Sequence, residues 1–82
     1  MTKREKKICE SLMNNAIMKA LNMKEEYNKY ERLKKDGDET TAEMTLRCFD
    51  QAYGYADGVY TFLDSLGFKH EKMNTLGQLL FI

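Results

Sequence analysis

Apolar residues recur at alternating spacings of four and three through residues 1–35. At about 100° per residue they fall on one side of a helix, in a stripe that comprises Cys9, Leu12, Met13, Ala16, Ala20, Met23, Tyr27 and Tyr30. This period predicts one amphipathic helix over about residues 3–35, roughly 50 Å long. Thr2 and Glu5 have the spacing of a capping box at its start. Gly37, in the turn 36–39, is suited to the left-handed conformation that ends a helix.

A second apolar stripe follows this turn and repeats every seven residues from Ala42 onward. It predicts a second helix over about residues 41–66, with Thr40 as the N-cap residue of a second capping box. Gly67 followed by Phe68 is typical of a Schellman stop, in which the apolar residue beyond the glycine packs back on the last turn.

Because the turn is short, the two helices are expected to be antiparallel neighbours. Lys19 should then lie near Asp57, and bases of the first helix should meet acids of the second along the edges of the contact. Cys9 and Cys48 would be far apart along the hairpin, so two free, reduced thiols are expected.

The last segment, residues 69–82, places Met73, Leu76 and Leu80 at helical spacing, which predicts a short third helix, although Gly77 weakens the pattern. Its apolar end is expected to cover the hairpin or enter a partner. The predicted fold class is all-α: a long antiparallel helical hairpin plus a short C-terminal helix or tail, forming a single domain over residues 1–82. We expect two copies to dimerise into a helical bundle.

Composition and charge agree with this architecture. The 82 residues include no proline and no tryptophan, which favours helices. The formal net charge of zero hides two segments of opposite sign, because residues 1–35 carry ten bases and five acids, whereas residues 36–68 carry seven acids and one base. Polar residues interrupt the apolar positions near the start, so neither a signal peptide nor a membrane span is expected, and we predict a cytoplasmic protein.

Further apolar residues lie outside the two main stripes and would remain uncovered in an isolated hairpin. Gly54 and Gly58 are four residues apart on the outward side of the second helix, where close approach of another backbone competes with a local kink as the explanation. The commoner arrangement is that the C-terminal segment covers one such surface and a second copy of the chain covers the other; the alternative is that one of them binds a different protein. The candidate interface residues are Ile17, Leu21, Met44, Cys48, Gly54, Tyr55, Gly58, Phe62, Leu79 and Phe81.

Two charged clusters remain. A basic cluster for anion or nucleic-acid contact, with a solvated helix face as the plainer explanation, comprises Lys3, Arg4, Lys6, Lys7 and His70. The acids Glu43, Asp50, Asp57 and Asp64 recur every seven residues. Successive members are about 10.5 Å apart along the axis, too far to share one metal ion. They form a solvated edge or a contact for a basic partner.

The chain shows none of the motifs that carry enzyme chemistry. His70 is the single histidine, and no Cys-x-x-Cys pair, His-Glu-x-x-His motif or glycine-rich phosphate loop occurs. We therefore expect no catalytic residue, metal or cofactor. The predicted function is a small non-enzymatic protein–protein interaction module, a regulatory adaptor or inhibitor of another protein. Its size would suit an accessory protein of a phage or mobile element acting on a host or defence system. The alternative is a nucleic-acid or nucleotide-binding accessory protein that uses the basic N-terminal turn.

Overall fold

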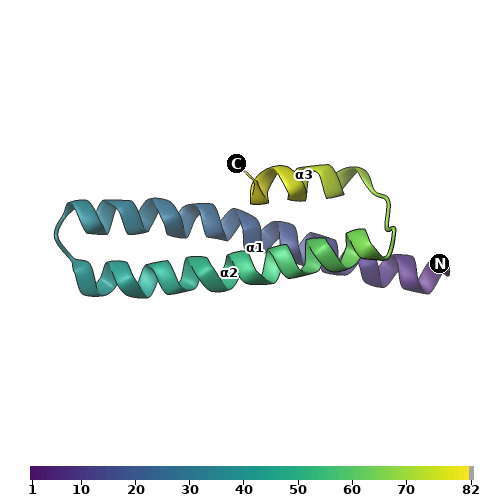
Figure 1. Cartoon of the computed structure of the whole chain (residues 1–82), viewed down its shortest axis with the longest axis horizontal. Coiled ribbons are helices and arrows are strands. Elements are labelled where there is room, and N and C mark those ends of the chain that lie inside the picture. Colours follow the sequence, from purple (N-terminus) through teal and green to yellow (C-terminus); the bar gives the residue numbers. More distant parts are fainter. Residues whose placement is uncertain (82) are drawn as a thin grey trace.

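A computed structural model describes residues 1–81, which form three α-helices: α1 (Lys3–Lys35), α2 (Glu39–Ser65) and α3 (Glu71–Leu80). α1 and α2 lie side by side as an antiparallel hairpin, and α3 turns back along one half of it (Figure 1). The molecule is a rod with extents of 52 × 18 × 16 Å. The prediction of an all-helical chain is confirmed, and so are the bounds of the first helix.

α1 begins and ends as its sequence predicts. The Thr2 hydroxyl accepts a hydrogen bond from the Glu5 amide at 3.1 Å, and the Glu5 carboxylate accepts one from the Thr2 amide at 3.3 Å. At the other end, Gly37 has φ 84°, and the Asp38 amide donates to the Leu33 carbonyl at 3.0 Å. These bonds satisfy backbone groups that a helix terminus leaves unpaired.

α2 begins two residues earlier than expected, and its N-cap is Asp38, so the prediction of Thr40 as the cap is wrong. The Asp38 carboxylate accepts a hydrogen bond from the Thr41 amide at 3.2 Å. A carboxylate at this position also interacts favourably with the positive end of the helix dipole. Because the Asp38 amide closes α1 as well, one residue joins the two helix ends and keeps the turn short.

The end of α2 is the predicted Schellman stop. Gly67 has φ 74°, and the Phe68 amide donates to the Leu63 carbonyl at 3.1 Å. Phe68 and Leu63 are both buried in the same core cluster. This reversal directs the chain back toward the hairpin, where α3 confirms the predicted third helix.

The core is deepest where all three helices meet. Met13 of α1, Leu63 of α2 and Leu76 of α3 are the largest fully buried side chains. Around them the core cluster contains Cys9, Ala16, Ala20, Ala56, Phe68, Met73 and Leu80. The small alanines of α1 and α2 allow the two helices to approach closely under α3.

Gly77, which weakens the helical pattern of α3, has a packing reason. A Cβ atom at this position would lie 3.3 Å from the Tyr60 ring and hydroxyl. The glycine therefore lets the aromatic ring of α2 lie against the backbone of α3. The ring of Phe81 meets the same tyrosine edge-on, with centroids 5.8 Å apart.

The expected ion pairs between α1 and α2 are not formed. Within residues 1–81 the contact found between a basic and an acidic side chain is that of His70 Nε2 with the Glu10 carboxylate at 3.8 Å, which links α1 to the start of α3. Lys19 does not pair with Asp57, because the two residues lie on opposite sides of the hairpin. At about 100° per residue, Lys19 points about 60° to one side, measured from Ala16. Asp57 points about 100° to the other side, measured from Ala56. Opposite net charge on two helices does not place individual charges opposite each other.

No helix in the described part of the chain has the length and apolar character needed to cross a membrane.

Candidate interaction surfaces

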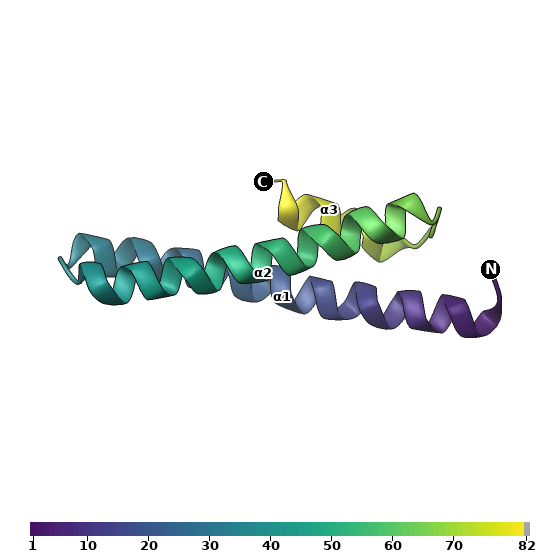
Figure 2. The same ribbon diagram turned by 60° about the horizontal axis from the view of Figure 1, so that its bottom comes forward.

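α3 covers only half of the hairpin face on which it lies. It is 10 residues long, against 33 in α1 and 27 in α2. In both views α3 lies over the N-terminal part of α1 and the C-terminal part of α2, whereas the end near the turn consists of two helices (Figures 1 and 2). The same face therefore continues beyond Leu80 without a third helix.

A groove of about 430 Å³ occupies this uncovered face directly beyond the end of α3. Aromatic rings form much of its floor: Tyr27 and Phe49 have centroids 5.3 Å apart, and Phe49 stacks on Tyr53 at 6.3 Å. Leu79 and Leu80 close one end, and Met23, Lys24 and Asn28 complete the wall on α1. We call this site the α3-end groove.

One residue of the groove has a perturbed ionisation. A hydrogen bond with the Glu31 carboxylate, and then the charge of that carboxylate, raise the pKa of Tyr27. The phenol of Tyr27 therefore keeps its proton to a higher pH than a free tyrosine does.

Acidic residues follow the α2 edge of this groove. On a helical wheel centred on Ala56, the groove residue Tyr53 lies at about +60°, and the acids Asp57 and Asp50 lie at about +100° and +120°. Glu43 continues the series one heptad earlier. The predicted row of acids is therefore an acidic margin beside an apolar floor.

The predicted flank of Met44, Cys48, Tyr55 and Phe62 lies on the other side of the hairpin. On the same wheel these four residues fall at about −80° to −120°. Met44, Tyr55 and Phe62 are 63%, 40% and 53% exposed, and Cys48 is also exposed. This surface, which we call the back stripe, has no cover from α3.

The two glycines of α2 occupy open space. A Cβ atom added at Gly54 or Gly58 would meet nothing within 4 Å. Both lie in the interior of an unbroken helix, where glycine costs about 1 kcal/mol relative to alanine. No contact within residues 1–81 accounts for that cost.

The remaining candidate interface residues have different environments. Ile17 and Leu79 are half-buried and pack against the core, because α3 covers this part of the hairpin. Leu21 is exposed, and so is most of Phe81, at 66%. The neighbouring residue Ile82, included in the expected apolar end, lies outside the described residues.

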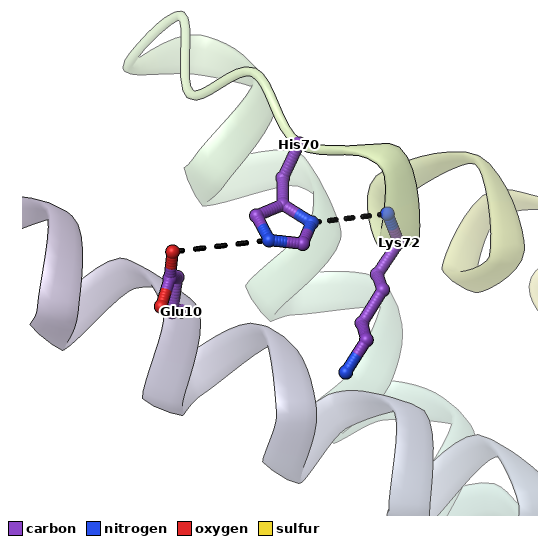
Figure 3. Close-up of polar contacts among 3 residues, drawn as sticks. All are labelled: Glu10, His70 and Lys72. Carbon is purple, nitrogen blue, oxygen red and sulfur yellow. Dashed lines mark hydrogen bonds and ion pairs between the residues drawn. The ribbon is translucent and has the colours of Figure 1, made fainter.

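The basic cluster divides into two parts. Lys3, Arg4, Lys6 and Lys7 are exposed on the first turns of α1. His70 is instead the N-cap of α3: its Nδ1 accepts a hydrogen bond from the Lys72 amide at 3.1 Å, and its Nε2 lies 3.8 Å from the Glu10 carboxylate (Figure 3). A neutral imidazole with its proton on Nε2 fits both contacts. The ring also stacks on Phe68 with centroids 6.0 Å apart.

The structure adds one surface that the sequence pattern did not single out. Tyr27 and Phe49 belong to the main apolar stripes and Tyr53 lies beside the stripe of α2, so periodicity assigned them to the core. The length of α3 is the feature that indicates this uncovered surface, because a helix of 10 residues spans about 15 Å, which is much less than the length of the hairpin. In the described part of the chain, no three histidine, cysteine, aspartate or glutamate side chains gather closely enough to hold a metal ion.

Comparison with protein-family models, with curated proteins and with solved structures gave no significant match.

Proposed function

We propose that the chain is a small non-enzymatic protein–protein interaction module, and that it acts as a regulatory adaptor or inhibitor by binding a helix of another protein in the α3-end groove. The observation that supports this is the half-covered face of the hairpin. One half binds α3, and the other half keeps an aromatic floor in contact with solvent. Exposed aromatic side chains that adjoin a covered part of the same face favour an interaction site here.

α3 itself is an example of the ligand that this face accepts. It presents Met73, Leu76 and Leu80 to the hairpin at spacings of three and four, as amphipathic helices do in helix-in-groove recognition. From the end of α3 to the turn, the free face runs beside about twelve residues of α1. A partner helix of about twelve residues, roughly 18 Å long, matches that length.

The charge of the groove margin indicates the charge expected of the partner helix. The α2 margin of the groove carries Glu43, Asp50 and Asp57. A helix that places lysine or arginine along one edge would meet this margin, and electrostatic complementarity of this kind favours fast and selective association. The expected partner segment is therefore a basic amphipathic helix.

Site-specific photo-cross-linking in the cells that contain the protein tests this proposal. A photo-reactive amino acid at Tyr27 is expected to capture a discrete protein through a basic helical segment. The same amino acid at Met18 is the matched control, because Met18 is 64% exposed on α1 but lines no part of the groove. Capture that is equal at the two positions, or capture through an acidic or non-helical segment, would contradict the proposal.

A second candidate function is nucleic-acid or nucleotide binding. Lys3, Arg4, Lys6 and Lys7 are exposed and lie within about 160° of each other around α1, on the side away from the core. Such a surface predicts binding that weakens steeply with salt and is lost when the four bases become glutamate. Titration of labelled single- and double-stranded oligonucleotides at two salt concentrations measures this. Binding that survives the four substitutions would exclude this surface as the contact.

A further inference from the structure

The back stripe of α2 has the period of a coiled-coil seam. Together with the neighbouring Gln51, Gly58 and Ser65, its four residues alternate at spacings of four and three along the helix: Met44, Cys48, Gln51, Tyr55, Gly58, Phe62 and Ser65. This is a second heptad series, separate from the series of Ala42, Phe49, Ala56 and Leu63 that packs on α1. Two such series on one helix mean that it can contact one helix on each side.

No residue of this series is charged. All five acids of α2 lie on the other edge of the helix, and its single base, Arg47, lies at the outward margin of the series, at about 180° from Ala56. A second helix laid along the stripe would thus bring no like charges into direct contact. Charged residues are depleted in the same way at the centres of protein interfaces.

We propose that the back stripe is the interface between two copies of this chain, in which α2 packs antiparallel to α2 of the second copy around a twofold axis at the level of residue 53. In this register Phe62 lies opposite Met44 of the second copy, Gly58 opposite Cys48, and Tyr55 opposite Gln51. The two residues of each pair are equally far from residue 53 in the sequence. The twofold axis therefore forms each of the three pairs twice, once from each copy, as an isologous contact requires.

The side chains fit this pairing in size and polarity. The largest residue of the stripe, Phe62, meets the flexible Met44, and glycine at position 58 leaves room for the Cys48 side chain. Tyr55 and Gln51 bring together a hydroxyl and an amide that can hydrogen-bond to each other. α3 lies on the opposite side of the hairpin and does not obstruct the second copy.

Three exposed side chains of the stripe supply much of the area that a dimer needs. Taking roughly 200 Å² for a side chain of this size, the exposed parts of Met44, Tyr55 and Phe62 supply about 300 Å² per copy. Two copies give about 600 Å² from these side chains alone, more than half of the roughly 1,000 Å² that a biological interface requires. Cys48, Gln51, Gly58 and the exposed Leu66 at the margin of the stripe add to this area.

Disulfide cross-linking distinguishes this register from the alternatives. Cys48 and its symmetry mate would be separated by ten residues, about 15 Å along the axis, which is beyond the reach of a disulfide. The variant Gly58→Cys places a thiol opposite Cys48 of the second copy. Within one chain, residues 48 and 58 are equally about 15 Å apart, so any bond between them joins two chains.

The experiment is mild oxidation of the full chain followed by denaturing electrophoresis without reductant. We expect Gly58→Cys to run as a covalent dimer, and the wild-type chain and the control Asp64→Cys to run at the mass of one chain because no disulfide joins the two copies. Asp64 is exposed on the opposite edge of the same helix. A wild-type dimer linked through Cys48, or equal cross-linking of the two cysteine variants, would overturn the antiparallel register.

Sedimentation equilibrium of the unmodified chain tests the same proposal without a new cysteine. We expect twice the chain mass for the wild type, one chain mass for Phe62→Asp, and retention of the dimer in Tyr27→Asp. A wild-type monomer would overturn self-association. Because Tyr27 lies in the α3-end groove and Phe62 in the back stripe, failure of the dimer leaves the cross-linking test of the proposed function unaffected.

Discussion

Alanine substitution of the two α2 glycines gives the sharpest stability prediction. Gly54 has no neighbour within 4 Å of an added Cβ atom, and it lies in the interior of a 27-residue helix. Replacing it by alanine removes backbone freedom from the unfolded chain and introduces no clash. The expected gain is about 0.8–1.0 kcal/mol of unfolding free energy.

In a domain of this size, 1 kcal/mol shifts the melting temperature by roughly 4–8 °C. Thermal unfolding followed by far-ultraviolet circular dichroism should therefore show a rise of about that size for Gly54→Ala. If the melting temperature fell instead, α2 would not be open to solvent at this position, and the environment described for the glycine would be refuted.

Gly58→Ala separates the isolated chain from the proposed dimer. The environment within one chain is as open as that of Gly54, so the two variants should gain equally at concentrations low enough to dissociate a dimer. At high concentration Gly58→Ala should gain less, because the new methyl group lies in the α2–α2 contact, and the stability of a dimer rises with concentration. Equal gains at every concentration would count against close packing at Gly58.

Three further substitutions test individual contacts. Gly77→Ala should not stabilise the wild type, because the Tyr60 ring crowds the new Cβ atom. In a Tyr60→Leu background, where that ring is gone, the same substitution should stabilise the chain by about 1 kcal/mol. Urea denaturation of the double-mutant cycle measures the difference, and equal effects in both backgrounds would contradict the contact. His70→Asn should keep the N-cap of α3, whereas His70→Ala should lose about 1 kcal/mol; equal losses by urea denaturation would exclude capping. Hydrogen bonds to Thr2 lower the pKa of Glu5, so its contribution to α1 should be complete above the ordinary glutamate pKa and lost as the pH falls through the lowered value. A pH titration of helicity that does not differ between the wild type and Glu5→Gln would show that this contribution is absent.

The helices could be predicted because their signals are local. The apolar period gives the bounds of α1, and Gly37 and Gly67 mark the two helix ends. The start of α2 was missed because Asp38 and Thr40 are both good N-cap residues two positions apart. The choice between them depends on the turn, in which the Asp38 amide is already bound to the end of α1.

Features that depend on three-dimensional arrangement were predicted less well. Periodicity gives the side of a helix that is apolar but not the side of the hairpin that α3 will cover. Lys19 and Asp57 were expected to pair because they lie at the same level of the hairpin, yet they lie on different sides of it. The α3-end groove was missed for a related reason: Tyr27 and Phe49 belong to the core stripe, and only the reach of α3 decides whether they are covered.

The half-covered hairpin also implies a gradient of local opening along the rod. Amides of α1 and α2 beneath α3 are held by a core that includes Met13, Leu63 and Leu76, and they should exchange their hydrogens only through near-global unfolding. The turn end, where Met23, Ala42 and Thr45 are the buried residues, can open without disturbing α3. The protection of backbone amides should therefore fall toward Gly37, so that the two helix ends flanking the groove can adjust their separation to the size of a bound helix while the α3 half stays folded.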